Sequence, residues 1–302
     1  MASDRVKLFT LLGDHPATIA LKNGAVASSL IDLEFDDVKV PNTAFKALVR
    51  EAKYDLAELA IVTFLQAKAL GKPYTLLPIT VMGRGQLHTL FYNSARGHLA
   101  PADLACKRIG VRSYTTTTGA WVRGILNEHY GVDPNRVNWI TFEDPHIAEF
   151  RDPPQVTRAA EGKMLEAMLL DGDIDAAILA KTDQPAPLAP VFPDAAAADA
   201  QWAQTHGGIP INHMLVMRSH IAQERPDVVR EIYRMFRAAK QAAYPTTPSP
   251  DPVRFGFEAC RGSLEAIIDY SAQQKLIAYR FSVEELFSET RDALNAEIEN
   301  RS

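Results

Sequence analysis

The stretch GVRSYTTTTGAWVRG, residues 110–124, concentrates hydroxyl groups beside arginine where a short strand should give way to a helix. A helix N-terminus leaves backbone N–H groups unpaired and carries partial positive charge, so nearby hydroxyls and an arginine can hold an anion there. We interpret the junction as a cradle for a carboxylate or a phosphate. Ordinary capping by one threonine in a polar turn is the alternative. The candidate ligand-binding residues are Arg112, Ser113, Thr115, Thr116, Thr117 and Thr118.

Two histidines lie on segments expected to cross between two lobes. His88 is in GRGQLHTLFYN and His213 is in GGIPINHMLVMR. Imidazole titrates near neutral pH and is suited to proton transfer. We predict that both are catalytic and meet in an interlobe cleft, although each could instead be a hydrogen-bonded structural histidine. Arg84, on the first of these segments, is predicted to bind an anionic substrate.

Further polar groups follow other expected strand ends. His146, in FEDPHIAEFRDPP, is a candidate substrate-binding residue or part of a solvated charged loop. Lys181 could offer a cation to an acidic ligand or be simply exposed. Glu58 is expected near a helix start, where its negative charge complements the helix dipole. The alternative is that its side chain reaches the cleft. His15 follows the first strand and points towards the same cleft.

Several kinds of chemistry lack support. Asp144 and His146 could contribute to a metal site, but no third ligand stands at supporting spacing, so we expect no metal. The chain contains no GxSxG and no HExxH, and neither cysteine has the local setting of a nucleophile. Without a Gly-rich loop ending in Lys-Ser/Thr, a nucleoside triphosphate is not expected.

The composition is that of a soluble globular protein, with 47% hydrophobic and 23% charged residues among 302. A net charge of −5 without any basic run argues against nucleic acid and anionic membranes as partners. No window reaches the roughly 18 apolar residues of a membrane span, and the N-terminus shows no secretion signal. We therefore expect a cytoplasmic protein that binds a small molecule, with a homo-oligomer left open.

Strand-like and helix-like segments alternate as in α/β proteins with largely parallel sheets. Residues 59–70 and 118–130 are expected to be helical, and 183–199, rich in proline and alanine, an irregular loop. The chain ends in helices, expected at 228–243, 257–275 and 283–298. These helices must pack against another element, and the first α/β unit has too few helices of its own to cover its sheet. We predict a discontinuous first lobe, residues 1–85 plus 219–302, and a second lobe, 86–218, with crossing strands near 86–92 and 212–218.

The sequence segments described above together resemble those of the 4,5-dihydroxyphthalate decarboxylases. The resemblance covers most of residues 5–290, and its most specific part is RxYTxTxxxWxRG, residues 112–124. It implies a two-lobed fold like that of type II periplasmic solute-binding proteins, with ligands bound in the interlobe cleft. It also implies non-oxidative decarboxylation of a hydroxylated aromatic dicarboxylate to 3,4-dihydroxybenzoate (protocatechuate) and CO2.

Such a reaction is consistent with the residues. The arginines and the threonine junction would hold carboxylates, and one histidine would protonate the ring carbon. No cofactor is expected, because the ring itself delocalises the charge. The main alternative is a solute-binding protein that captures an aromatic carboxylate for transport or sensing. A different enzyme acting on another cyclic acid is a third option.

Overall fold

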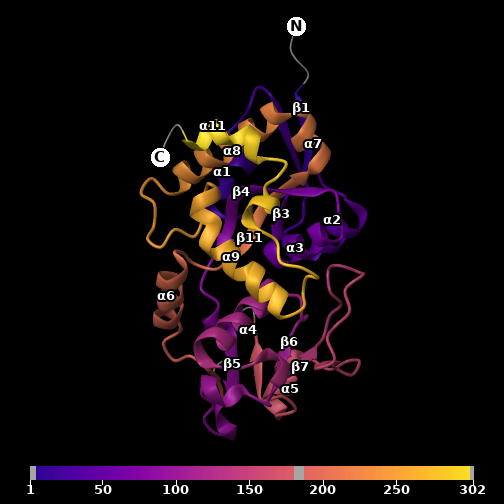
Figure 1. The fold of residues 1–302 in the computed structure, drawn as a ribbon, viewed down its shortest axis with the longest axis vertical. Helices are drawn as coiled ribbons and strands as arrows, with labels where there is room; N and C mark the ends of the chain where they lie inside the picture. Colours follow the sequence, from indigo (N-terminus) through magenta and orange to yellow (C-terminus); the bar gives the residue numbers. More distant parts are fainter. Residues whose placement is uncertain (1–4, 180–186, 300–302) are drawn as a thin grey trace.

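Strands and helices alternate along much of the chain and form two separate β-sheets. The structure is a computed structural model that describes residues 5–179 and 187–299. One sheet lies in the upper lobe of Figure 1 and the other in the lower lobe, and both ends of the chain lie in the upper lobe. The protein therefore has the two-lobed α/β architecture that the sequence predicts. Within the described part of the chain, no helix has the length and apolar character needed to cross a membrane.

The first sheet has the strand order β2-β1-β3-β11-β4. The first three of these strands are parallel, and β11 runs antiparallel to both of its neighbours. The sequence analysis assigned residues 212–218 to the second lobe, whereas β11 belongs to the first sheet. Its side chains from Met214 to Met217 are fully buried there, between two apolar strands. The strands are β1 (Val6–Leu11), β2 (Ile31–Phe35), β3 (Leu56–Ala60), β4 (Tyr74–Gly83) and β11 (Ile211–Arg218).

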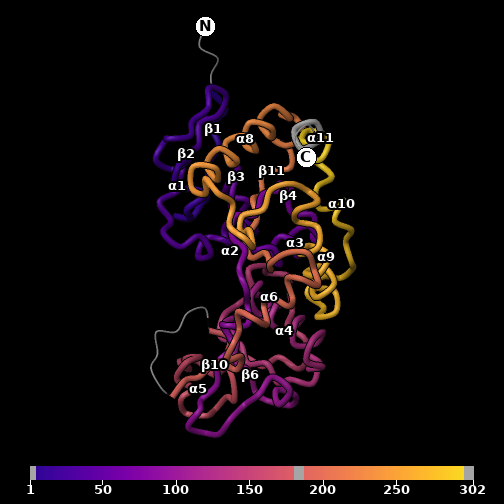
Figure 2. Tube along the Cα trace, turned by 90° about the vertical axis from the view of Figure 1, so that its left-hand side faces the viewer, coloured from indigo at the N-terminus to yellow at the C-terminus, as the bar shows by residue number. Residues whose placement is uncertain are grey.

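The helices in the upper lobe come from both ends of the chain (Figures 1 and 2). Helix α8 buries one apolar face, including Ile232 and Phe236, in a cluster that also holds Leu8 of β1. The helix expected at 283–298 is broken into α10 and α11. The helices are α1 (Pro16–Lys22), α2 (Phe45–Glu51), α3 (Ile61–Ala69), α7 (Ser219–Glu224), α8 (Pro226–Ala243), α9 (Phe257–Gln273), α10 (Val283–Leu286) and α11 (Arg291–Glu299).

The second sheet has the order β10-β5-β9-β6-β7-β8. The strands β9, β6, β7 and β8 pair in parallel, whereas β5 pairs antiparallel with both of its neighbours, β9 and β10. The strands are β5 (Leu90–Asn93), β6 (Arg108–Val111), β7 (Asn138–Thr141), β8 (Val156–Arg158), β9 (Ala176–Ile178) and β10 (Leu188–Pro190), and the helices are α4 (Thr117–Tyr130), α5 (Leu165–Asp171) and α6 (Ala195–His206). Short 3₁₀ turns occupy Pro41–Ala44, Leu87–Thr89, Ser94–Arg96, Pro101–Leu104 and Pro134–Arg136.

Two predicted segments differ from the structure for identifiable reasons. The segment 59–70 is not one helix, because β3 runs to Ala60 and α3 begins at the next residue, with no Gly or Pro to mark the change. The loop predicted at 183–199 contains β10 and the start of α6. Its alanine run favours a helix, and the Asp194 carboxylate caps that helix by accepting from the Ala197 N–H.

Helix α4 is the main contact of the second lobe with α9. The Trp121 indole donates to the Ile211 carbonyl at 2.8 Å, and Arg123 is completely buried. The Arg123 guanidinium donates to Gln274 Oε1 and to the Tyr114 carbonyl, at 2.7 and 2.6 Å. The second arginine of the motif therefore holds the lobes together rather than binding a ligand.

Candidate functional site

A cleft of about 730 Å³ lies between the lobes, as the sequence analysis expected. Phe45 and Ala60 line it from the first lobe, and β11 contributes His213. The second lobe contributes the start of α4 and the loop that carries His146. Parallel strands and helix N-termini therefore meet at one surface, where α/β proteins commonly bind ligands.

The threonines at the start of α4 have separate roles. Thr116 caps the helix by accepting from the Gly119 N–H at 3.3 Å. Thr117 Oγ1 accepts from the backbone N–H of Val62, also at 3.3 Å, and Thr118 Oγ1 accepts from the Asn212 side chain at 3.4 Å. All three threonines line the cleft.

A second helix N-terminus meets the first one. Helix α3 begins at Ile61, and its N-cap residue, Ala60, has no side chain that could cap it. The bond from Val62 to Thr117 joins the two helix starts directly. Partial positive charge from both helices is thus directed at the same part of the cleft, which favours an anion there.

Ser113 and Thr115 do not face the cleft. Both are buried, and their hydroxyl oxygens lie 3.3 Å apart. Neither is among the residues that line the cavity. The structure therefore brings only part of the predicted hydroxyl cluster to the ligand space.

Arg84 and Arg112 both line the cleft, but in different electrostatic settings. Arg112 forms an ion pair with Glu143 at 3.2 Å, and its side chain is 40% exposed. Burial lowers the pKa of Arg84, and its Nε is buried without a hydrogen-bond partner in the described residues. Because Arg84 lines the cleft, its positive charge would favour an anionic ligand there.

His213 belongs to a chain of three ionisable groups, in which Glu58 is buried between two partly exposed histidines. Its Nδ1 lies 3.0 Å from Oε1 of Glu58, and Nε2 of His15 lies 2.8 Å from Oε2 of the same carboxylate. Glu58 is fully buried and also accepts from the Gly13 N–H at 3.0 Å. Because Nδ1 is held by Glu58, Nε2 is the nitrogen of His213 left for a partner in the cleft.

The two imidazoles keep Glu58 ionised. Burial alone would raise the pKa of Glu58, but the hydrogen bonds and charges of His15 and His213 outweigh it and hold that pKa well below its usual range. Burial likewise opposes the charged form of His15, yet the bond to Glu58 raises the pKa of His15 overall. Glu58 can therefore stabilise an imidazolium at the cleft.

His146 lies on the opposite side of the cleft and reaches across to the first lobe. Its Nδ1 is 2.8 Å from the Thr63 hydroxyl of α3, and its ring meets Phe45 edge to face. Burial, helped by the positive charge of Arg112, lowers the pKa of His146 to about 4. The imidazole is therefore neutral near pH 7.

The two remaining candidates are His88 and Lys181. His88 is exposed on the turn Leu87–Thr89 and does not line the cavity, so the structure does not bring it to His213. Lys181 lies outside the described residues.

Glu58, which is expected near a helix start, lies instead within strand β3. Residues Leu56–Ala60 form a strand in which every residue is buried, so an ionised side chain there needs charged partners. A lone glutamate within an apolar run, LAELA, was the available signal. Asn212, which joins Thr118 and Gln86, was also missed.

Comparisons with known proteins agree with this architecture. The alkanesulfonate-binding protein SsuA of Xanthomonas axonopodis pv. citri, solved bound to MOPS, superimposes with a TM-score of 0.55 at 14% identity, covering 94% of this chain and 99% of that one. The fold is thus that of the periplasmic binding proteins. No protein-family model matches the chain.

Two relatives with similar sequences identify the family within this fold. A 4,5-dihydroxyphthalate decarboxylase of Comamonas testosteroni is 29% identical over 252 residues, which cover 79% of this chain and 76% of that protein. A protein of the same name from Pseudomonas putida is 31% identical over 184 residues, covering 58% of this chain and 70% of that one. The chain belongs to the 4,5-dihydroxyphthalate decarboxylase family.

Proposed function

We propose that this protein decarboxylates a hydroxylated aromatic dicarboxylate such as 4,5-dihydroxyphthalate, giving 3,4-dihydroxybenzoate and CO2. The observation that carries the proposal is the bond between Glu58 and His213, because the His213 imidazole lines the same cleft as the guanidinium of Arg84. The proposed proton donor and the proposed anion-binding residue thus line the same cleft. Family membership supplies the substrate class.

Binding would use the positive end of the cleft. One substrate carboxylate would meet Arg84, and the other would meet the joined N-termini of α3 and α4 with the hydroxyls of Thr116 and Thr118. Arg112 would add a further positive charge, part of which is already neutralised by its ion pair with Glu143. Two adjacent carboxylates would in this way be held by two separate sets of donors.

The chemical step requires a proton delivered to a ring carbon. A ring hydroxyl para to the departing carboxylate increases electron density at the carbon that bears it, and the neutral imidazole of His146 could polarise that hydroxyl. His213 Nε2 would protonate the carbon while Glu58 stabilises the imidazolium beforehand. The C–C bond then breaks and its electron pair returns to the ring. One proton is taken up and one CO2 is released, so the step needs no oxidant or reductant.

The decisive experiment is incubation with 4,5-dihydroxyphthalate. We expect equal amounts of CO2 and 3,4-dihydroxybenzoate, measured by gas analysis and chromatography. A rise in melting temperature with the ligand but no CO2 would contradict the proposal. That result would support the alternative of a solute-binding protein, which the fold shared with SsuA favours.

Substitution of the acid–base pair tests the mechanism. His213→Gln should lower kcat by about 10²-fold or more, because general acid catalysis is lost. Glu58→Gln should lower kcat with a smaller change in KM, since Glu58 acts through His213 and does not line the cleft. His88→Gln is the control, because His88 is exposed outside the cleft. Unchanged kcat in His213→Gln would remove His213 from the mechanism.

A further inference from the structure

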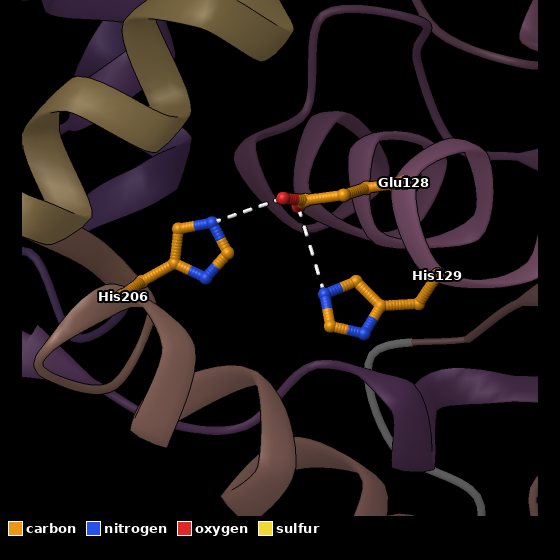
Figure 3. A group of neighbouring side chains, drawn as sticks. All are labelled: Glu128, His129 and His206. Carbon is orange, nitrogen blue, oxygen red and sulfur yellow. Dashed lines mark ion pairs between the residues drawn. The ribbon is translucent and has the colours of Figure 1, made fainter.

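A second group of ionisable side chains lies away from the cleft, where α4 ends close to the end of α6. Glu128 and His129 come from the last turn of α4, and His206 is the last residue of α6 (Figure 3). A cavity of about 440 Å³ opens beside Glu128 and His206 and shares no residue with the cleft. The catalytic proposal above uses none of these three residues.

The spacing of these groups is that of ligands around one metal ion. His206 Nε2 lies 3.3 Å from Glu128 Oε1, and His129 Nε2 lies 3.7 Å from Glu128 Oε2. One ligand atom from each residue falls within 4.8 Å of the other two. Ligands bound tetrahedrally to zinc at 2.0–2.1 Å are about 3.4 Å apart, so small side-chain adjustments would close the site around the ion.

The orientation of His206 leaves its Nε2 facing the carboxylate of Glu128. Its Nδ1 lies 3.1 Å from the carbonyl oxygen of Trp202, and a carbonyl can only accept, so Nδ1 carries the hydrogen. In the neutral imidazole, Nε2 then presents a lone pair towards the carboxylate of Glu128. Two lone pairs 3.3 Å apart need a proton or a metal ion between them. A histidine held through Nδ1 by a backbone carbonyl is a common arrangement in metal sites.

Glu128 is oriented by a second layer of hydrogen bonds. The Tyr270 hydroxyl donates to Glu128 Oε2, and the Trp202 indole donates to the Tyr270 oxygen at 3.0 Å. Trp202 also stacks on the ring of His206, with the centroids 4.2 Å apart. The same two aromatic residues therefore position both the carboxylate and one imidazole, as outer-shell residues do around bound metals.

We propose that Glu128, His129 and His206 bind one zinc ion, with a fourth position open towards the adjoining cavity. Two imidazoles and a carboxylate are ligands suited to this metal. This departs from the expectation of no metal site. The sequence could not indicate the site, because His206 lies more than seventy residues beyond the Glu128-His129 pair. The ion would tie the end of α4, in the second lobe, to α6 and to Tyr270 of α9, and so stiffen the side of the molecule away from the cleft.

The test is a titration of metal-free protein with Zn²⁺ against a chromophoric chelator, followed by Co²⁺. We expect one equivalent of Zn²⁺ per chain, a higher melting temperature with zinc, and the strong visible absorption of tetrahedral Co²⁺. His129→Ala should weaken zinc binding by about 10-fold or more and abolish the absorption, since one of three protein ligands is lost. His206→Ala should do the same.

Controls make the outcome decisive. His220→Ala removes an exposed histidine from α7 and should bind zinc as the wild type does. His129→Ala is the main variant, because His206 stacks on Trp202 and its replacement could disturb folding. Equal zinc affinity in wild type and His129→Ala, or no stoichiometric binding at all, would overturn the proposal.

Discussion

Arg84 and Arg112 show how the surroundings of a residue can matter more than its type. Both line the cleft, but Arg112 has a carboxylate partner in Glu143, whereas the buried Nε of Arg84 has no hydrogen-bond partner in the described part of the chain. An ion pair exposed to solvent contributes little, whereas a desolvated guanidinium gains strongly from an anionic ligand. The sequence motif contains Arg112, but we propose Arg84 as the stronger anion-binding residue.

The first prediction compares these two arginines. Arg84→Gln should raise KM for 4,5-dihydroxyphthalate by roughly 10- to 100-fold, the equivalent of one charged hydrogen bond. Arg112→Gln should raise KM less, because Glu143 already neutralises part of its charge. Steady-state kinetics would measure both, with the exposed Arg136→Gln as the control. A larger effect at Arg112 than at Arg84 would contradict this ranking.

Helix α4 shows what the most specific motif of the sequence does at the level of an element. Its first turn faces the cleft. Trp121, Arg123 and Gly124 instead face α9 and β11. The ring of Tyr270 packs directly over Gly124 and meets Trp121 edge to face. The motif therefore combines a helix start that lines the cleft with the contact that fixes that helix against the first lobe.

The second prediction tests this packing. A Cβ added at Gly124 would overlap the ring of Tyr270, so Gly124→Ala should lower the free energy of unfolding by about 1–3 kcal/mol. Urea denaturation would measure the change. Asn127→Ala, at an exposed position of the same helix, should not destabilise the protein. Equal free energies of unfolding for the two variants would contradict the close packing of α4 against α9.

At the scale of the whole molecule, the loop after β7 joins the two lobes across the cleft. The Arg50 guanidinium of α2 donates to the carbonyls of Pro145 and His146, both at 2.8 Å. Lys72 pairs with Glu149 at 2.6 Å, and Thr63 bonds to the His146 ring. Because His146 is held neutral by burial in this contact, protonation would oppose the closed arrangement of the lobes.

The third prediction concerns pH. In the unfolded chain the imidazole of residue 146 takes up a proton near its usual pKa of 6.5, whereas in the folded protein the pKa of His146 is about 4. The unfolded state thus binds more protons between these values, and the free energy of unfolding should fall as the pH drops from 6.5 to 4. The contribution is at most about 3 kcal/mol.

His146→Gln should make this pH dependence shallower, as measured by urea denaturation at several pH values. His220→Gln, at an exposed position, is the control and should keep the wild-type slope. An unchanged slope in His146→Gln would mean that the ring is not buried as a neutral group in solution.

Much of the fold followed from local patterns in the sequence. Alternating apolar segments predicted an α/β protein of two lobes, and the threonine run predicted the start of α4 within one residue. The join between β3 and α3 was not predicted, because no Gly or Pro separates the two elements. Residues 195–199 were assigned to a loop, since nearby prolines outweighed their alanine content.

By itself the sequence determined which residue types were available: hydroxyls at a helix start, arginines near strand ends and scattered histidines. Only the tertiary structure decided which of them meet. In the folded protein His213 contacts Glu58, His88 is exposed at the surface and Arg123 is buried in the interior. The reason is physical, since strand pairing between residues more than 150 positions apart brings β11 beside β3, and no local pattern encodes that register.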